Sequence, residues 1–409
     1  MKAFLKVAFS QTSGVCAVAI LAAVGVAAGE NAWTAKEQDA AWTRSWWRPR
    51  FEEKQKAVRD GARPRVVFVG DSITHFWERE KDGGIATWRK YFTGEPYAAL
   101  DLGFSGDKTQ HVLWRIGHGA LDGLSPAAVV LMIGTNNVGF GKDRADEPTV
   151  DTLLGVRAVL RAIRERLPTA RIILCALLPS GPEPGFPHRL RTDAVNRELW
   201  RLANGRDVVW CDFSEDFLMP DGTLSRELMV DPDRVHPTAR GYEIWAGAMI
   251  PQLNEILDGK NRPIAPRLPC GIAPRLYAHD TPHTVNATSR MDEDGWCEKV
   301  RFARQRVLDD GAKAYDVVLL GDEHGSAVPE PGRRVLDLRI SGDRTEHILW
   351  RVRNGALDGV AAAEVVLSAG GNNGTDAGET KDDIARGVAA IREEVRRRLP
   401  QAKITESCR

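Results

Sequence analysis

The chain has 409 residues, with 56 Lys and Arg against 56 Asp and Glu, so its formal net charge is zero. This length is greater than one ordinary core requires and predicts at least two folding units. Hydrophobic residues make up 43% and charged residues 27% of the chain, which excludes a largely disordered or fibrous protein. A neutral balance without a long basic run also argues against a nucleic-acid partner.

The N-terminus has the pattern of a targeting segment. Lys2 and Lys6 precede an apolar run at residues 15–28 (VCAVAILAAVGVAA), which ends in small residues of the kind signal peptidase accepts. A membrane anchor, the alternative, needs about 20 apolar residues, and this run is shorter. We therefore expect a signal peptide at residues 1–28, a secreted or periplasmic protein, and no stable membrane anchor after cleavage.

The cysteines show no metal-binding pattern, and no metal or other cofactor is expected. Cys175 and Cys211 lie in apolar runs and are expected to be buried thiols on strands. Cys270 and Cys297 flank a proline-rich stretch, and the sequence leaves open whether they form a disulfide.

Residues 29–63 form a tryptophan-rich segment of helical composition that Pro49 is expected to interrupt. Residues 64–258 then alternate between short apolar runs and helical stretches such as 149–167, and end with a helix around 241–257. Near-continuous apolar strands separated by helices predict a parallel sheet covered on both faces. The five runs are RVVFVG, YAALDLG, AAVVLMIG, ARIILCALLP and DVVWCDF.

A proline-rich linker is expected at residues 259–295, and residues 296–409 repeat part of the preceding unit. The segment that begins DLGFSGDKTQHVLWR at Asp101 recurs as DLRISGDRTEHILWR at Asp337, an offset of 337 − 101 = 236 without gaps. Further back, VVFVGD matches VVLLGD, and Trp46 is paired with Trp296. We expect a truncated second domain that packs against the first lobe or pairs with another chain to cover its sheet edge.

Polar residues follow the first two apolar runs of the first unit. Ser72 closes VVFVGDS at the carboxyl end of a strand, the edge where open α/β folds place ligands. By itself Gly-Asp-Ser is a common turn, and Ser72 could be only a helix cap. The second run leads into Ser105-Gly106-Asp107, where a glycine lets a backbone N–H point into a cleft or merely forms a tight turn.

Two further motifs complete the set. Asn136, in GTNN after the third run, could donate its side-chain N–H to an oxyanion or cap a turn. Near the C-terminal end of the unit, Asp233 and His236 lie three residues apart before Pro237, so that the carboxylate could orient the imidazole as a general base. Asp231 is a rival for the carboxylate because it lies only two residues from Asp233. We expect residues 72, 106, 136, 233 and 236 to meet around one cleft.

With these four blocks in this order, residues 64–258 resemble the SGNH/GDSL hydrolase superfamily. The stretches GDKTQHVLWR and GTNN are similar to the branch that contains platelet-activating-factor acetylhydrolase catalytic subunits and bacterial carbohydrate acetylesterases. GTNN replaces the GxND of much of the superfamily, and that branch shares this form. The resemblance implies a flavodoxin-like three-layer α/β/α fold with a five-stranded parallel sheet and no cofactor. It also implies a nucleophile at Ser72, a base at His236, its partner at Asp233, and oxyanion donors at the backbone N–H groups of Ser72 and Gly106 and the side chain of Asn136.

The repeat keeps some of these residues and has lost others. Gly342 and Asn372 match Gly106 and Asn136, but the sequence Gly-Asp-Ser has become Gly-Asp-Glu at residues 321–323, and no Asp-x-x-His follows. Donors without a nucleophile or base cannot transfer an acyl group, so the second lobe is predicted to be inactive.

The leading hypothesis is thus a secreted serine esterase that removes acetyl or other short acyl groups from carbohydrate in the extracellular space. A lipid or lysophospholipid acyl hydrolase is the alternative, although no hydrophobic insertion large enough for a long acyl channel is present. A non-catalytic carbohydrate-binding protein is the second alternative, favoured by the inactive repeat and by tryptophans expected to be exposed, such as Trp46 and Trp47.

Overall fold

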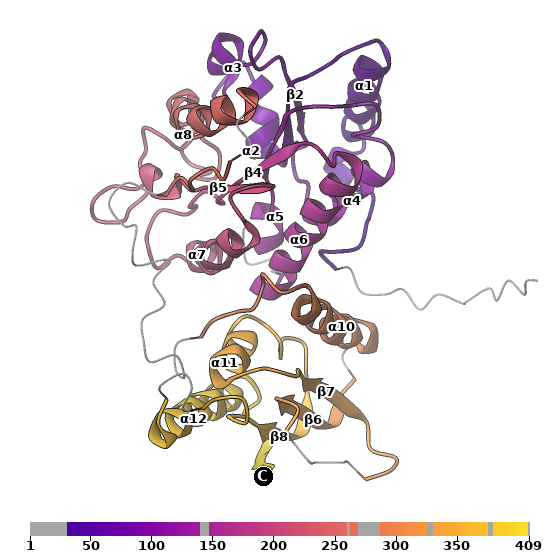
Figure 1. Cartoon of the computed structure of the whole chain (residues 1–409), viewed down its shortest axis with the longest axis vertical. Helices are drawn as coiled ribbons and strands as arrows, with labels where there is room; N and C mark the ends of the chain where they lie inside the picture. Colours follow the sequence, from indigo (N-terminus) through magenta and orange to yellow (C-terminus); the bar gives the residue numbers. More distant parts are fainter. Residues whose placement is uncertain are drawn as a thin grey trace, which may run out of the picture.

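The structure, a computed structural model, describes residues 31–139, 147–259, 262–268, 287–311, 313–324, 330–374 and 379–407. They form two lobes stacked along the long axis of the molecule, the first coloured from indigo through magenta to salmon and the second from orange-brown to yellow (Figure 1). The expected signal peptide at residues 1–28 lies outside the described residues. No helix in the described part of the chain is long and apolar enough to cross a membrane.

The first lobe is built on one five-stranded parallel sheet with the order β2-β1-β3-β4-β5. This order confirms the predicted flavodoxin-like fold. The strand interiors are almost entirely buried, because helices cover both faces of the sheet. The strands are β1 (Val66–Gly70), β2 (Ala99–Gly103), β3 (Ala128–Met132), β4 (Arg171–Cys175) and β5 (Val208–Cys211).

Helices α3 and α8 pack together on one face of this sheet, whereas α4, α6 and α7 pack on the other (Figure 1). Tyr242 of α8 donates its hydroxyl to the carbonyl of Ile73 at 2.6 Å and so ties α8 to the short helix that follows β1. The helices are α2 (Ser72–His75), α3 (Ile85–Tyr91), α4 (Thr109–Gly117), α5 (Thr135–Val138), α6 (Thr149–Arg166), α7 (Pro187–Leu199) and α8 (Ala239–Leu257), with 3₁₀ turns η2 (Phe76–Glu78), η3 (Trp200–Leu202) and η4 (Ser214–Phe217).

The N-terminal segment corrects two expectations. Pro49 does not interrupt the helix: α1 (Trp47–Arg59) begins two residues earlier, and Pro49 lies in its first turn, where a missing N–H costs no helical hydrogen bond. Trp47 is buried, and its Nε1–H donates to Asp107 Oδ1 at 2.7 Å. The exposed ring of this segment is that of Trp42, in the 3₁₀ turn η1 (Ala41–Thr43), with 51% of its surface accessible.

The second lobe contains a further parallel sheet of four strands in the order β7-β6-β8-β9. The first lobe has the corresponding order β2-β1-β3-β4. In each lobe the first strand lies inside the sheet and the second strand lies at its edge. Helix α10 begins two residues before the expected boundary at 296. The elements are α10 (Asp294–Asp310), β6 (Tyr315–Gly321), β7 (Val335–Arg339), α11 (Thr345–Arg353), β8 (Ala362–Ser368), α12 (Lys381–Arg398) and β9 (Lys403–Glu406).

A buried tryptophan–aspartate contact shows how the two lobes correspond. Trp296 Nε1–H donates to Asp343 Oδ1 at 2.7 Å, as Trp47 does to Asp107. Trp296 therefore corresponds to Trp47, and the expected pairing with Trp46 is wrong. Two adjacent tryptophans cannot be told apart by an alignment, whereas only one of them faces the core.

The stretch expected to be a linker is partly built into the body of the protein. Ile264 is buried, and Arg267 forms a parallel bridge with Cys211 beside β5. Farther along, Ser289 and Met291 are buried between the lobes. Residues 269–286 lie outside the described residues. The linker predicted at residues 259–295 is therefore too long, because both of its described ends pack against folded parts of the protein.

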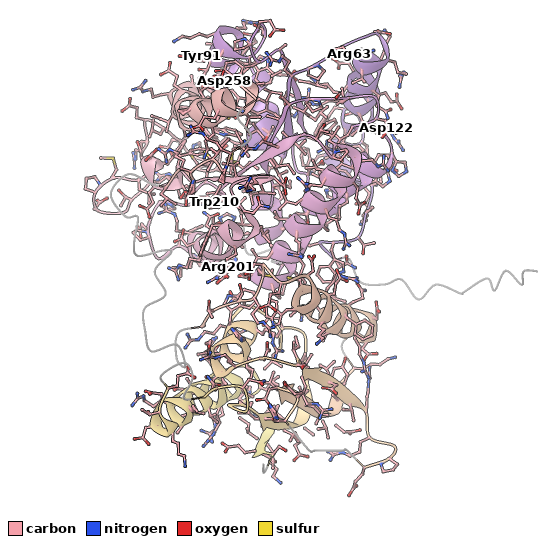
Figure 2. The ribbon with its side chains drawn as sticks, in the orientation of Figure 1. Arg63, Tyr91, Asp122, Arg201, Trp210 and Asp258 are labelled. Carbon is pink, nitrogen blue, oxygen red and sulfur yellow. The ribbon has the colours of Figure 1, made fainter. Side chains whose placement is uncertain are left out.

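The second lobe has a hydrophobic core of its own and also contributes side chains to the core of the first lobe. Trp296, Val300 and Trp350 of the second lobe belong to the same cluster of buried side chains as the sheet of the first. Polar contacts reinforce it: Trp350 Nε1–H donates to Glu198 at 2.8 Å, and Arg201, at the edge of the first lobe that faces the second (Figure 2), donates to Thr288 at 2.8 Å. Of the two expected arrangements, packing within the chain is therefore observed, and pairing with another chain stays a prediction.

Three cysteines in the described residues are free and buried, namely Cys175, Cys211 and Cys297. The first two lie on strands, as expected. Cys297 forms no disulfide with a described residue, and its pairing with Cys270 is not tested because Cys270 lies outside the described residues.

A buried ion pair between the lobes leads to a stability prediction. Arg304 of α10 donates to both carboxylate oxygens of Asp151 of α6, at 2.9 and 3.0 Å, and both residues are only 3% exposed. Replacing Arg304 with alanine leaves the carboxylate buried without its partner, which we expect to lower the free energy of unfolding by about 3–5 kcal/mol. Urea unfolding followed by tryptophan fluorescence measures this change.

Arg301 provides the matched control on the same helix. It pairs with Glu298 at the surface, so Arg301→Ala is expected to change the free energy of unfolding by less than about 1 kcal/mol. Equal losses in the two variants would show that the buried pair does not hold the lobes together.

Candidate active site

Ser72 is presented at the end of β1 by a tight turn. Asp71 caps the following helix, since its Oδ1 accepts the N–H of Ile73 at 2.9 Å. A Cβ on Gly70 would lie 2.5 Å from the carbonyl oxygen of Met132, so only glycine fits before this turn. The Ser72 hydroxyl therefore emerges at the carboxyl edge of the sheet, as the motif predicted.

His236 lies in the loop before α8 and reaches the serine. Its Nε2 is 2.7 Å from Ser72 Oγ, and its Nδ1 is 2.7 Å from Asp233 Oδ2. Partial burial works against the charged form of Asp233, but hydrogen bonds from the His236 ring and the backbone N–H groups of Val235 and His236 lower its pKa. An ionised Asp233 can only accept, so Nδ1 carries the proton and Nε2 is free to accept one from the serine.

The rival carboxylate is oriented differently. Asp231 accepts a hydrogen bond from Arg234 Nε at 3.3 Å. Asp233 also uses its other oxygen, Oδ1, to accept the N–H of Val235 at 3.0 Å, which anchors the carboxylate to the loop. The geometry thus favours Asp233 over Asp231 as the partner of the imidazole.

Gly106 and Asn136 come from the ends of the neighbouring strands β2 and β3. Gly106 has a φ of +79°, which only glycine adopts readily, and its N–H has no acceptor among the described residues. Asn136 uses one amide hydrogen to bond the carbonyl of Asp107 at 2.9 Å, so its other hydrogen remains for a ligand.

Asp107 holds the loop that follows β2 in place from its buried side. It is fully buried and accepts hydrogen bonds from Trp47 and, at 2.8 Å, from Arg115 Nε. Burial raises the pKa of Asp107 to about 6, although Arg115 opposes this rise. The sequence motif Ser-Gly-Asp thus combines a glycine facing the cavity with an aspartate that fixes the loop.

All five predicted site residues line one cavity of about 450 Å³. The structure thus brings residues 72, 106, 136, 233 and 236 together at one edge of the first lobe, as expected. The remaining lining residues are Trp42, Trp46, His75, Phe76, Ser105 and Val235.

Several of these residues were not predicted from the sequence. His75 Nδ1 lies 2.9 Å from Ser105 Oγ, and burial, with Arg50 nearby, lowers the pKa of His75 to about 3. The centroid of the Phe76 ring lies 4.6 Å from that of the His236 ring, and the two rings are tilted by 31°. His75 and Phe76 lie three and four residues after Ser72, which is one helical turn further along the chain. This spacing could have identified them from the sequence.

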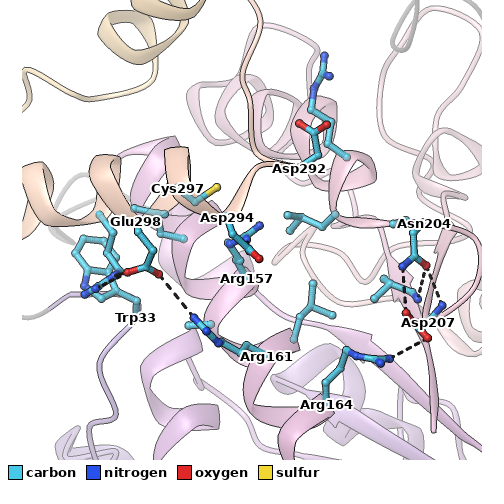
Figure 3. Close-up of a pocket in the computed structure, with 18 of the residues that line it drawn as sticks. Trp33, Arg157, Arg161, Arg164, Asn204, Asp207, Asp292, Asp294, Cys297 and Glu298 are labelled. Atoms are coloured by element: carbon cyan, nitrogen blue, oxygen red, sulfur yellow. Dashed lines mark hydrogen bonds and ion pairs between the residues drawn. The ribbon is translucent and has the colours of Figure 1, made fainter. Parts of the chain in front are cut away.

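A larger hollow of about 1030 Å³ lies between α6 and α10, where the lobes meet (Figure 3). Its arginines are paired with acids: Arg161 lies 3.8 Å from Glu298, and Arg164 lies 3.4 Å from Asp207. The described residues that line it include no serine and no histidine. Among the described residues no group of three or more His, Cys, Asp or Glu side chains could hold a metal ion.

An α/β/α fold with a serine, a histidine and a carboxylate in line at the carboxyl edge of its sheet defines an enzyme of the acyl-hydrolase class. Residues 68–244 match the model of the GDSL-like Lipase/Acylhydrolase family. The alpha1 subunit of platelet-activating factor acetylhydrolase IB from Bos taurus is 36% identical over 181 residues, which cover 44% of this chain and 70% of the relative. The chain belongs to the GDSL-like lipase/acylhydrolase family and is an ester hydrolase.

The chain is also similar to a second curated relative and to solved structures. The alpha2 subunit from Rattus norvegicus is 35% identical over 184 residues, covering 44% of this chain and 71% of the relative. Among solved structures, a GDSL-like lipase from Bacteroides thetaiotaomicron is 20% identical, with a TM-score of 0.41, and the match covers 50% of this chain and 97% of that one.

Proposed function

We propose that Ser72, His236 and Asp233 form a catalytic triad in an exported esterase that removes acetyl or other short acyl groups, with acetylated carbohydrate as the substrate. The observation that carries this proposal is the position of the His236 ring, 2.7 Å from both Ser72 Oγ and Asp233 Oδ2. A serine hydroxyl is a weak nucleophile until a base in this position removes its proton.

The reaction follows from the geometry. Ser72 Oγ attacks the ester carbonyl while its proton passes to His236 Nε2, and Asp233 stabilises the imidazolium. The oxyanion that forms is held by the N–H groups of Ser72 and Gly106 and the amide of Asn136. His236 then returns the proton to the leaving alcohol. Water, activated by the same imidazole, releases the acid and restores the serine.

The residues that line the cavity favour a substrate with a short acyl group. Trp42 lies against the oxyanion donors, since a Cβ on Gly106 would lie 2.5 Å from its Cζ2. The ring centroid of Trp46 lies 5.8 Å from that of Trp42 and 5.6 Å from that of His75, so that Trp46 extends the aromatic wall. The names of the curated relatives, acetylhydrolases, agree with a small acyl group.

The aromatic wall formed by Trp42 and Trp46 also favours a carbohydrate as the alcohol part of the ester. The Trp42 ring is half exposed beside the cavity and offers a flat apolar face with a polar edge. Export, inferred from residues 1–28, would bring the enzyme to extracellular polymers.

A chain-length series tests this proposal. We expect kcat/KM for p-nitrophenyl esters to fall at least about tenfold from acetate to octanoate, because the indole of Trp42 blocks longer chains. Acetylated xylan and pectin should release acetate, whereas lysophospholipid should not be cleaved. Trp42→Ala is the matched variant, and it should extend the accepted chain length. A preference for octanoate or lysophospholipid in the unaltered enzyme would support the lipid hydrolase instead.

A further inference from the structure

The second lobe has a glutamate where the first has its serine. Glu323 follows β6 as Ser72 follows β1, and its side chain turns back to the edge of the sheet. Its Oε2 accepts the backbone N–H of Gly342 at 2.8 Å and the side-chain N–H of Asn372 at 3.0 Å. A negatively charged oxygen is thus held by two convergent donors.

These donors are built as Gly106 and Asn136 are in the first lobe. Gly342 has a φ of +82°, against +79° for Gly106. Asn372 donates its other amide hydrogen to the carbonyl of Asp343 at 3.0 Å, just as Asn136 donates to the carbonyl of Asp107 at 2.9 Å. The difference is that the donors of the first lobe face a cavity, whereas those of the second bind a carboxylate of the same chain.

The surroundings suit a carboxylate. His324 Nε2 lies 3.2 Å from Asn372 Oδ1, a contact that turns the amide N–H of Asn372 toward Glu323. Although burial opposes the charge, hydrogen bonds from Asn372 and from the N–H of Gly342 lower the pKa of Glu323 to about 2. Glu323 therefore stays ionised, and bound, at neutral pH.

We propose that Gly342 and Asn372 form a monocarboxylate site that Glu323 fills from within the chain, which excludes external acyl groups from the second lobe. This inference concerns the second lobe alone and does not depend on the proposed ester hydrolysis. Because the internal carboxylate is tethered beside its donors, free acids cannot compete with it. A shorter side chain at position 323 should open the site to a small carboxylate such as acetate.

The test is the thermal unfolding of the full-length Glu323→Ala variant at pH 7, in 0.5 M sodium acetate and in 0.5 M sodium chloride. We expect this variant to unfold at a lower temperature than the unaltered protein in chloride, and acetate to raise its Tm by about 2–4 °C more than chloride does. The unaltered protein should show no such difference beyond the general effect of the salt.

Two control variants isolate the site. In Glu323→Gln the amide carbonyl can still accept from both donors, so the Tm should show no specific response to acetate. In Glu323→Ala combined with Asn372→Ala one donor is missing, and only the general effect of the salt should remain. An acetate response of Glu323→Ala no larger than that of the double variant would overturn the proposal.

A second variant covers the case in which Glu323→Ala does not fold. Asn372→Asp in the otherwise native chain places a second carboxylate against Glu323, so its loss in Tm should be larger at pH 7 than at pH 4, where one of the two acids can take up a proton. Equal losses at both pH values would mean that Glu323 is not bound there, and would contradict the proposal.

Discussion

Replacing Ser72 with alanine is expected to lower kcat for ester hydrolysis by roughly 10⁶-fold while leaving the fold intact, as in other serine hydrolases that lose their nucleophile. Without the hydroxyl, His236 has no group from which to take the proton, and no acyl-enzyme can form. Turnover of p-nitrophenyl acetate measures the loss, and circular dichroism checks the fold.

Ser105→Ala is the matched control for this experiment. Ser105 lines the same cavity, but its hydroxyl contacts His75 and not His236. Its loss should leave the nucleophile in place and reduce kcat far less. A serine-directed phosphonate should label the unaltered protein and Ser105→Ala on the peptide that contains Ser72. Unchanged turnover in Ser72→Ala would assign the activity to another residue or to a contaminant.

The second large effect is expected for Asp233→Asn, with a fall in kcat of about 10⁴-fold. An asparagine at this position can donate to Nδ1, which would place the His236 proton on Nε2, where it cannot accept from Ser72. Stopped-assay measurement of kcat with p-nitrophenyl acetate tests this expectation, with KM expected to change little.

Asp231→Asn distinguishes the two aspartates. Its carboxylate pairs with Arg234 and does not touch the imidazole, so we expect a change in kcat of less than about tenfold. If Asp231→Asn were the more damaging substitution, the acid would have to be reassigned to Asp231.

The pairing of the two lobes illustrates where sequence comparison reaches its limit. The offset of 236 residues correctly relates Asp107 to Asp343, because residues 101–137 align with residues 337–373 without a gap. Before β1 the comparison must choose between Trp46 and Trp47, and both choices align a tryptophan. Only the packing decides, since Trp47 alone donates to the buried aspartate.

The role of position 323 shows a second limit. The loss of the serine is visible in the sequence, and it predicts inactivity. That the new glutamate bonds Gly342 and Asn372 could not be foreseen, because the rotamer that brings its carboxylate back to the donors depends on the loops around it.

The sequence by itself determined the parallel sheet, the order of the motifs and the five residues that meet at its edge. It could do so because apolar runs encode buried strands, and parallel strands bring their carboxyl ends to one side. The tertiary structure alone decided that Trp42 and His75 complete the cavity, and that Arg304 and Trp350 join the lobes. These features rest on contacts between side chains distant in sequence, whose directions are set by packing and not by local pattern.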